Sequence, residues 1–355
     1  MKLILIGIAV LLILIIAFVI TGIAVNKRNM KKNKYDLLDH FKKNKDNLSI
    51  TLKENGQDTL SINSNKKYPL ASTLKIIIAF NFVKNALDNK ISITDTVKLD
   101  ELEKFYIPNT DGGAHPKWKK SIDYPAETSL LEVAKGMMQF SSNACTDFLI
   151  DKIGTDVINK SIEELQLDHD KISYFTPTIL IPGYLADNRK IAIDKLNVMD
   201  QRSYQELSIA LFPKMKVNKT DYLARKARKM LSHKVQLLMT NKMPSSTTQQ
   251  YADLMTRLGN KLLTKKEKDL FSEIMIGENL KSDSDDYLWY KGGSTLFVLT
   301  SALYKESQDN TTSVSLFIKD DTGGELYWIR NAFNDFVISL ATDIEFRKKV
   351  KEVIG

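Results

Sequence analysis

The sequence predicts an α/β (α+β) fold in which an antiparallel sheet, built from both ends of the chain and flanked by helices, lies beside an all-helical lobe. Strand-like segments occur near both ends, at residues 48–53, 59–63, 296–303 and 312–318. The first two alternate apolar and polar residues around Asn55-Gly56, a dipeptide typical of two-residue hairpin turns. Residues 72–87 are apolar on nearly every side, as expected of a helix buried between layers.

Helical periodicity accounts for much of the remaining chain. Residues 35–43 and 130–138 predict amphipathic helices, and residues 331–353 predict a single helix that closes the chain. Residues 104–121, which contain Asp111-Gly112-Gly113, predict a long loop. Residues 184–244 predict a mostly helical region. A chain of 355 residues is long enough to bury a large core in two lobes.

The N-terminal segment predicts a membrane anchor. Residues 3–25 carry no charged side chain and are mostly aliphatic. At ~1.5 Å per residue they span about 34 Å as a helix, which is enough to cross a bilayer. They are longer than the apolar core of a usual signal peptide, and no clear cleavage site follows them. We expect an uncleaved signal-anchor segment at residues 1–34, with a cleaved signal peptide as the alternative, and one globular domain at residues 35–355.

The net charge of +8 is unevenly distributed. The positive excess lies in residues 1–34 and 184–244, so the rest of the chain is acidic on balance. No recognition motif accompanies these basic segments, and we expect no nucleic-acid partner. The basic residues after position 25 favour a cytoplasmic domain by the positive-inside rule, although long domains can translocate regardless of that charge. Residues 184–244 predict either a solvated helical lid or a face for an anionic polymer.

Metal and cofactor sites are not expected. The histidines lack the spacing of metal ligands, and the single cysteine cannot form an internal disulfide. Cys145 follows a helix cap and is expected to pack inside that helix. These residues are His40, His115, His169, His233 and Cys145.

Ser72 and Lys75 form the first candidate site. A spacing of three residues places both side chains on one face of a helix. Serine becomes nucleophilic when a neighbouring base takes its proton, and a lysine in apolar surroundings can lose its charge and act as that base. The apolar run that follows Lys75 supplies such surroundings. A second Ser-x-x-Lys pair, Ser64 and Lys67, lies in polar sequence and favours a solvated turn.

Two further segments can complete a site. Ser141 could relay a proton to a leaving group, and the Asn143 amide could hold a substrate carbonyl. The alternative for this segment is a helix cap, because serine and asparagine are favoured at helix starts. Lys291, in the strand-like segment 289–299, could attract a carboxylate, and Gly292-Gly293 would allow substrate to approach that strand closely. The alternative is a hairpin turn followed by a buried strand.

In this order, Ser-x-x-Lys, Ser-x-Asn and Lys-x-Gly resemble the three motifs of class A β-lactamases and penicillin-binding proteins. Residues 69–75, Pro-Leu-Ala-Ser-Thr-Leu-Lys, are similar to the nucleophile segment of that family. Residues 247–255, followed by Leu262-Leu263, are similar to its helix before the final strands. The resemblance covers roughly residues 35–183 and 245–350, so residues 184–244 look like an insertion. It implies a β-lactamase/transpeptidase-like fold.

The resemblance also implies a role for each matching residue. Ser72 would be the acylated nucleophile, Lys75 its base or proton partner, and Ser141 the proton relay. Asn143 would contact a substrate amide and Lys291 the substrate carboxylate. Gly293 and Ser294 would lie against the substrate, and the backbone N–H groups of Ser72 and Ser294 would form the oxyanion hole.

The sequence departs from the family pattern at three places. Ser142 occupies a position where many β-lactamases carry aspartate. Gly292 occupies a position where a hydroxyl residue is usual, which weakens carboxylate recognition unless Ser294 partly substitutes. The third departure is the glutamate that positions the deacylating water in class A β-lactamases.

No carboxylate occupies the expected place of that glutamate. Ile181-Pro182-Gly183 resembles the Pro-Gly turn that ends the corresponding loop, and counting back places Tyr174 at the glutamate position. No Asp or Glu occurs at residues 171–186. Asp170 and Asp187 bracket this gap, and Asp194 is a more distant candidate. Acylation could therefore proceed while deacylation of a β-lactam would be slow.

The resemblance favours a membrane-anchored, extracytoplasmic serine hydrolase of the penicillin-binding or DD-peptidase type, acting on D-alanyl groups of cell-wall material without a cofactor. Expected partners are cell-wall peptide, an anionic wall polymer or a β-lactam as substrate, and the cell membrane through residues 3–25. Three alternatives stay open: a class A β-lactamase, a D-alanyl esterase acting on teichoic acid, and a non-catalytic wall-binding module.

Overall fold

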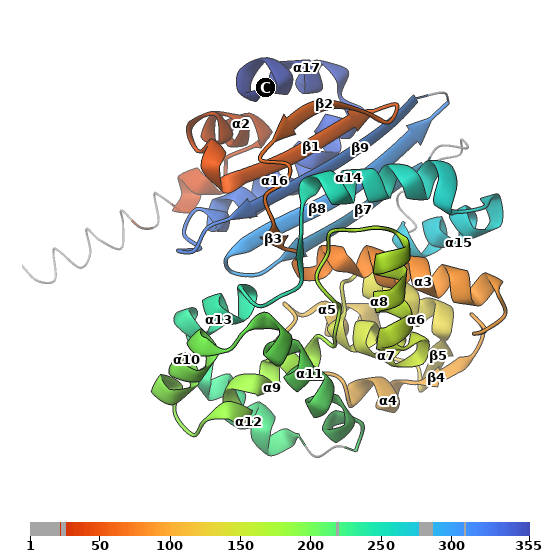
Figure 1. Cartoon of the computed structure of the whole chain (residues 1–355), viewed down its shortest axis with the longest axis vertical. Coiled ribbons are helices and arrows are strands. Elements are labelled where there is room, and N and C mark those ends of the chain that lie inside the picture. Colours follow the sequence, from red (N-terminus) through yellow and green to blue (C-terminus); the bar gives the residue numbers. More distant parts are fainter. Residues whose placement is uncertain (1–21, 23–25, 218–219, 277–286, 309) are drawn as a thin grey trace, which may run out of the picture.

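The computed structural model describes residues 22, 26–217, 220–276, 287–308 and 310–355 (Figure 1). The predicted membrane segment, residues 3–25, lies outside these residues except for Gly22. No helix of the described part of the chain combines the length and the apolar character that a bilayer crossing requires.

The predicted sheet is confirmed and contains five antiparallel strands (Figure 1). Its spatial order is β2-β1-β9-β8-β7, so strands from both ends of the chain pair directly, as β1 does with β9. The strands are β1 (Leu48–Glu54), β2 (Gln57–Ile62), β7 (Tyr287–Ser294), β8 (Val298–Ser307) and β9 (Asn310–Lys319). Asn55 and Gly56 join β1 to β2 with φ values of 50° and 81°, the left-handed pair that a tight hairpin turn requires. The segment 289–299 is the end of β7, a short turn and the start of β8.

Three helices from the chain termini cover one face of the sheet and share an apolar core with β1, β8 and β9 (Figure 1). They are α2 (Lys34–Lys43), α16 (Leu326–Thr342) and α17 (Ile344–Ile354). The prediction of one helix at 331–353 is wrong. Asp343 breaks it with φ −111° and ψ 105°, and its side chain accepts from the Phe346 N–H at 3.0 Å, which starts α17.

The other face of the sheet packs against α14 (Thr248–Arg257). This helix corresponds to the one predicted at residues 247–255. Beyond α14 lies α3 (Lys75–Leu87), whose first nine residues are all buried. A 3₁₀ turn, η2 (Ala71–Leu74), leads into α3 from β3 (Tyr68–Pro69), and β3 pairs with β6 (Ser245–Ser246). This arrangement confirms the central buried helix, and it places the Ser72 segment between the sheet and the helical lobe.

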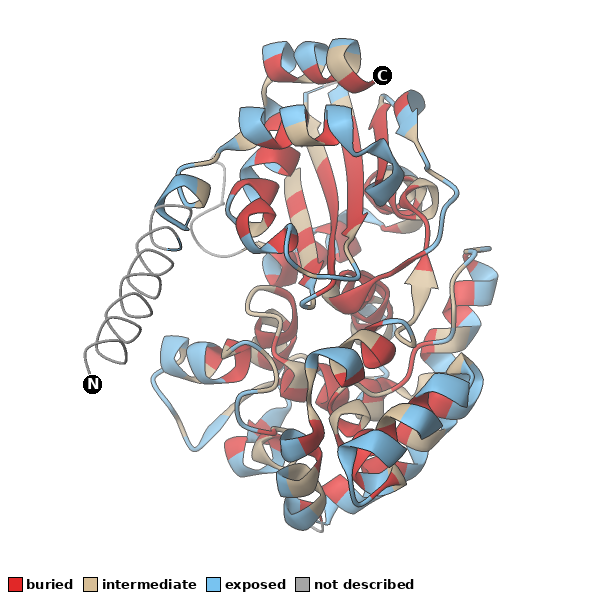
Figure 2. Ribbon diagram, turned by 90° about the vertical axis from the view of Figure 1, so that its left-hand side faces the viewer, coloured by how far each residue is buried: buried red, intermediate tan, exposed pale blue. Residues whose placement is uncertain are grey.

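The helical lobe begins after α3. It contains α4 (Leu99–Glu103), α5 (Ala114–Ser121), α6 (Leu130–Met138), α7 (Asn143–Ile153), α8 (Thr155–Glu164) and α15 (Lys265–Met275), with a small sheet of β4 (Thr96–Lys98) and β5 (Glu127–Ser129). Figure 2 shows buried residues on the inner faces of both lobes and exposed residues on their outer helices. The loop predicted at 104–121 is shorter than expected, because α5 begins at Ala114, where the Asp111 carboxylate accepts from the N–H groups of Gly113 and His115.

Five helices follow, of which the last four confirm the helical prediction for residues 184–244. They are α9 (Thr176–Leu185), α10 (Arg189–Val198), α11 (Gln201–Lys216), α12 (Asp221–Met230) and α13 (His233–Thr240). The predicted Pro-Gly turn at 181–183 is wrong, since Pro182 and Gly183 lie inside α9. A Cβ on Gly183 would lie 2.8 Å from the Ala227 nitrogen, so this glycine permits close packing of α9 on α12 instead of a turn.

Candidate active site

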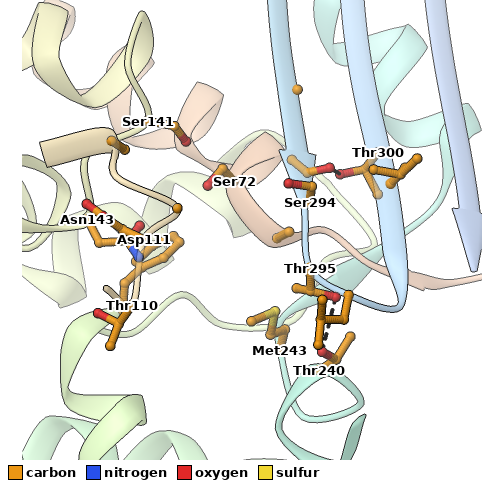
Figure 3. A pocket seen from close by; sticks show the side chains of 18 of the residues that line it. Ser72, Thr110, Asp111, Ser141, Asn143, Thr240, Met243, Ser294, Thr295 and Thr300 are labelled. Atoms are coloured by element: carbon orange, nitrogen blue, oxygen red, sulfur yellow. Dashed lines mark hydrogen bonds between the residues drawn. The ribbon is translucent and has the colours of Figure 1, made fainter. Parts of the chain in front are cut away.

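The nucleophile segment lies where the sheet meets the helical lobe. Ser72 is in η2, and the Leu70 N–H donates to the Pro244 carbonyl at 3.0 Å just before it. Ala71 has a φ of 46°, in the left-handed region that non-glycine residues rarely adopt. Backbone strain of this kind persists only where the surrounding structure holds it. The Ser72 side chain lies on the wall of a pocket of about 800 Å³ (Figure 3).

Lys75 lies beneath this pocket, at the start of α3, and is fully buried. Its amine donates to the Ser141 carbonyl at 2.8 Å, to the Ser141 hydroxyl at 3.3 Å and to the Asn143 side-chain oxygen at 2.9 Å. Burial, and next the nearby Lys291 amine, hold the pKa of Lys75 well below its usual value. The lowered pKa favours the neutral amine, which is the form that can accept a proton from a serine hydroxyl.

The helix-cap interpretation of the 141–143 segment is confirmed. Ser142 caps α7, because its hydroxyl accepts from the Cys145 N–H at 3.2 Å. Ser141 precedes the cap with a φ of 69°, and Asn143 is the first residue of α7. Both side chains line the pocket from the helical lobe, on the side opposite β7 (Figure 3). The cap therefore fixes two polar side chains at the pocket wall.

The edge strand β7 supplies the opposite wall. The Lys291 amine donates to the Ser141 hydroxyl at 3.1 Å and to the Gly292 carbonyl at 3.0 Å, and burial lowers the pKa of Lys291 to about 7. A Cβ on Gly293 would lie 2.5 Å from the Leu70 carbonyl oxygen and 2.7 Å from the Ser72 nitrogen. Glycine at 293 is therefore needed for β7 to approach the nucleophile segment this closely.

The structure brings all seven predicted site residues together. Six of them line the one pocket, and Lys75 reaches it through its hydrogen bonds to Ser141 and Asn143. The six lining residues are Ser72, Ser141, Asn143, Lys291, Gly293 and Ser294. The arrangement combines a hydroxyl nucleophile, a buried amine, a bridging hydroxyl and a closely packed pair of backbone segments. These are the groups that acyl transfer through a serine ester requires.

Aromatic side chains occupy position 174, to which the sequence count assigned the deacylating glutamate, and the adjacent position 175. Tyr174 stacks on Phe212 with ring centroids 3.6 Å apart and planes within 4°, and burial raises the pKa of its phenol to about 12. The next residue, Phe175, lines the pocket, and its ring centroid lies 4.9 Å from the Lys75 amine. An aromatic ring instead of a carboxylate thus faces the lysine.

The alternative carboxylates are engaged elsewhere. Asp170 accepts from the Ser245 N–H at 2.8 Å, and Asp187 pairs with Lys226 at 2.5 Å. Asp194 is exposed on α10. Among the described residues that line the pocket, Asp111 is the only acidic one, and both of its oxygens accept backbone hydrogen bonds at the start of α5.

Two charged side chains in or next to the site escaped the sequence reasoning. Arg330 of α16 lines the pocket and donates to the Thr295 carbonyl, and burial lowers the pKa of its guanidinium. Asp147 of α7 is fully buried and accepts from the N–H groups of Phe175 at 2.6 Å and Thr176 at 2.7 Å. Burial raises the pKa of Asp147 to about 6, although these N–H groups oppose the shift. The only sequence feature that indicates a place for Asp147 near the site is its position one helical turn after Asn143.

Comparisons with known proteins agree with this geometry. The model of the family described as the beta-lactamase enzyme family matches residues 32–283. The structure is similar to a class A beta-lactamase from Bacteroides cellulosilyticus, with a TM-score of 0.54 and 14% identity over 92% of this chain and 98% of that chain. It is also similar to a beta-lactamase from Sphaerobacter thermophilus, with a TM-score of 0.54 and 14% identity over 86% of this chain and 91% of that chain. No curated protein matches the sequence.

Each comparison establishes something different. At such low identity, the solved structures show the fold alone, and they confirm the expected β-lactamase-like architecture. The family match covers most of the chain and includes the segments of Ser72, Lys75, Ser141 and Asn143. The chain therefore belongs to the β-lactamase enzyme family, a family of serine hydrolases.

Proposed function

We propose that this chain is a membrane-anchored, extracytoplasmic serine hydrolase of the penicillin-binding or DD-peptidase type. In this proposal Ser72 forms an acyl-enzyme with D-alanyl groups of cell-wall material. The buried Lys75 amine, the Ser141 hydroxyl between two lysines, and the close approach of Gly293 to Ser72 support the acyl-transfer chemistry. The uncharged segment at residues 3–25 supports the anchor.

The acylation step uses residues from both walls of the pocket. The Ser72 oxygen attacks the carbonyl carbon while its proton passes to the neutral amine of Lys75. The oxyanion accepts hydrogen bonds from the backbone N–H groups of Ser72 and Ser294. When the C–N bond breaks, a proton passes through the Ser141 hydroxyl to the leaving amine. A seryl ester remains, and a later nucleophile, water or an amine, cleaves it.

The observation that carries this choice is the Phe175 ring beside the Lys75 amine, at 4.9 Å. An efficient β-lactamase of class A needs a carboxylate to activate the deacylating water. Outside the pocket, the neighbouring Tyr174 is stacked on Phe212, and within the pocket the carboxylate of Asp111 accepts backbone hydrogen bonds at the start of α5. We therefore expect a β-lactam to acylate Ser72 quickly and to leave slowly.

Intact-protein mass spectrometry after incubation with benzylpenicillin tests the proposal. We expect a mass increase of one penicillin that persists for at least tens of minutes after free drug is removed. Ser72→Ala should abolish the adduct. Ser64→Ala, which alters the other Ser-x-x-Lys pair, is the matched control and should retain it. Loss of the adduct within seconds would instead identify a β-lactamase.

A second assay separates the peptide substrate from the ester. Release of D-alanine from a D-alanyl-D-alanine peptide supports the proposal. Release from D-alanylated teichoic acid without release from the peptide would identify a D-alanyl esterase. A chain that neither forms the adduct nor releases D-alanine from either material contradicts the proposal.

A further inference from the structure

The pocket extends well beyond the residues that the chemistry requires. Its lining continues from Ser72 and Ser294 onto residues 175–179, at the start of α9, and onto the segment 231–243, which includes α13. Most of the side chains that these two segments contribute are apolar, and none is charged; the apolar ones, which we call the apolar wall, are Phe175, Ile179, Leu231, Met239 and Met243. Three of these five residues, Leu231, Met239 and Met243, lie in the predicted insertion at residues 184–244.

The apolar wall is tied to the catalytic strand. The Thr240 hydroxyl donates to the Thr295 hydroxyl at 3.2 Å, directly after β7 (Figure 3). His233 packs edge-on against Phe297 and lies 3.0 Å from the Thr322 carbonyl through its Nε2. These contacts hold both ends of α13 against the α/β lobe, so the wall lies at a fixed distance from the nucleophile.

The end of the segment is continuous with the nucleophile turn. Gln201 donates to the Met243 carbonyl at 3.0 Å, and the Pro244 carbonyl accepts from the Leu70 N–H at 3.0 Å. Only Ala71 lies between Leu70 and Ser72 along the chain. Figure 3 shows Met243 and Thr240 beside Thr295, at the end of β7 away from Ser141. The wall is therefore part of the same rigid frame that positions the reacting serine.

The direction of β7 indicates which part of a substrate meets the wall. Lys291 lines the pocket near the Tyr290 end of the β7 lining, and Ser294 lies three residues further along, about 10 Å away at strand spacing. A substrate whose carboxylate binds Lys291 and whose carbonyl lies between the Ser72 and Ser294 N–H groups must extend past Thr295. The group that enters this region is on the acyl side of the scissile bond.

We propose that the apolar wall is a binding site for an extended apolar group on the acyl donor. This inference rests on the proposed acyl-transfer function and specifies its substrate class. Methionine side chains are flexible and polarisable, and they adapt to hydrocarbon of different shapes. A pocket of about 800 Å³ also exceeds what a D-alanyl group alone requires, since pockets of this size accommodate drug-sized ligands.

Two thioesters that differ only in the acyl chain test the inference. N-acetyl- and N-octanoyl-D-alanyl-thioglycolate both carry a carboxylate on the leaving thiol. Hydrolysis breaks the C–S bond; water supplies the hydroxyl of the product N-acyl-D-alanine, and the thiol leaves with a proton for detection. Because burial of each methylene favours binding, we expect kcat/KM for the octanoyl substrate to exceed that of the acetyl substrate at least tenfold.

Variants of the wall assign that preference to named residues. The double variant Met239→Ser and Met243→Ser should reduce the octanoyl-to-acetyl ratio at least fivefold, whereas Met239→Leu with Met243→Leu should preserve it. Met30→Ser, at a methionine that is 57% exposed, is the matched control and should leave the ratio unchanged. Thermal unfolding checks that each variant is folded, and Met243→Ser alone, at a half-buried position, replaces the double variant if that one does not fold.

A binding measurement distinguishes an error in the apolar-wall inference from an error in the proposed acyl-transfer function. In the Ser72→Ala variant, calorimetry should show N-octanoyl-D-alanine binding at least tenfold more tightly than N-acetyl-D-alanine. Equal kcat/KM values for the two thioesters, or equal affinities for the two acids, would overturn the inference even if Ser72 is acylated by penicillin. If neither thioester is hydrolysed, the affinities alone decide it. An unchanged ratio in a folded serine variant would equally overturn it.

Discussion

The Lys75 amine donates to both oxygens of Ser141, at 2.8 Å from the carbonyl and 3.3 Å from the hydroxyl. The Lys291 amine donates to the same hydroxyl from the other side, at 3.1 Å. Burial lowers the pKa of both amines, and the nearby Lys291 amine lowers the pKa of Lys75 further. The Ser141 hydroxyl is thus the connection through which protons can pass between the two walls of the pocket.

The pKa of Lys291 predicts the pH dependence of acylation. Lys291 is charged below about pH 7 and neutral above it, and only the charged form attracts a carboxylate. The second-order rate constant for benzylpenicillin should therefore fall above about pH 7, by roughly threefold to tenfold by pH 8.5, because this constant reports the free enzyme. A neutral ester should lack this alkaline fall. Stopped-flow acylation across pH 6–9 measures it.

Lys291→Arg gives the matched control for this profile. Arginine keeps its charge throughout the range, so the alkaline fall should disappear in the variant even if the overall rate is lower. An alkaline fall of equal size in Lys291→Arg, or with the neutral ester, would show that another group controls it.

Burial of Lys291 should also lower the free energy of unfolding, by an amount that depends on pH. Its folded-state pKa of about 7 lies below the usual 10.5, so its contribution to stability is most favourable above pH 10.5, falls as pH decreases from 10.5 to about 7, and stays constant below that. Lys291→Met removes a buried amine that must be charged in acid. We expect this variant to gain about 2 kcal/mol of unfolding free energy at pH 6, with the gain shrinking as pH approaches 10.

Urea unfolding at several pH values measures the gain. Lys190→Met, at an exposed position on α10, serves as the control and should show no such trend. A Lys291→Met variant that is no more stable than the parent at pH 6 would mean that the hydrogen bonds to Ser141 and Gly292 outweigh the cost of burying the amine.

Gly293→Ala should separate β7 from the nucleophile turn. The added Cβ would lie 2.5 Å from the Leu70 carbonyl, 2.6 Å from the Thr300 hydroxyl and 2.7 Å from the Ser72 nitrogen, so β7 must shift. Misplacing one oxyanion donor costs roughly 100- to 1,000-fold in rate, and we expect penicillin acylation to slow by about that factor.

Gly292→Ala is the matched substitution one residue away. Its Cβ would meet only the far end of the Tyr290 side chain, at 3.0 Å. Acylation should slow far less than in Gly293→Ala, and circular dichroism should show both variants folded. An equal decrease in acylation rate in the two variants would mean that a general disturbance of β7, and not its contact with Ser72, causes the decrease.

Local patterns were enough to predict the sheet and the motif residues. The strands on either side of Asn55-Gly56 alternate apolar and polar residues, a pattern that is visible in the sequence. Ser72 and Lys75 are three residues apart, so their proximity is also visible in the sequence. The break at Asp343 was missed because the apolar pattern continues across it, and only the cap to Phe346 reveals it. Such a cap depends on backbone angles that the sequence does not display.

The errors and omissions in the site all involve contacts between distant segments. Pro182-Gly183 is typical of a turn, yet packing of Gly183 against Ala227 keeps both residues in α9. Arg330 reaches the pocket only because α16 covers the sheet beside Thr295. Neither segment contains a pattern that indicates its distant contact. Tertiary packing overrides the turn preference of Pro182-Gly183, and it brings Arg330 into the pocket.

A carboxylate placed beside Lys75 should convert slow deacylation into turnover. Phe175→Glu replaces the ring that faces the Lys75 amine, so a water next to the acyl-enzyme would gain a general base. We expect the lifetime of the penicillin adduct to shorten at least tenfold, measured by mass spectrometry over time. Acylation should slow as well, because a nearby negative charge raises the pKa of Lys75.

Tyr174→Glu is the control that distinguishes position from charge. Its side chain would point toward Phe212 and away from the pocket, so the adduct lifetime should stay within about twofold of the parent while the loss of stacking lowers thermal stability. If Tyr174→Glu shortens the adduct lifetime and Phe175→Glu does not, then residue 174 faces the acyl group during the reaction. Deacylation would then be restored from position 174, to which the sequence count assigned the missing glutamate, and not from position 175, whose ring lies beside Lys75.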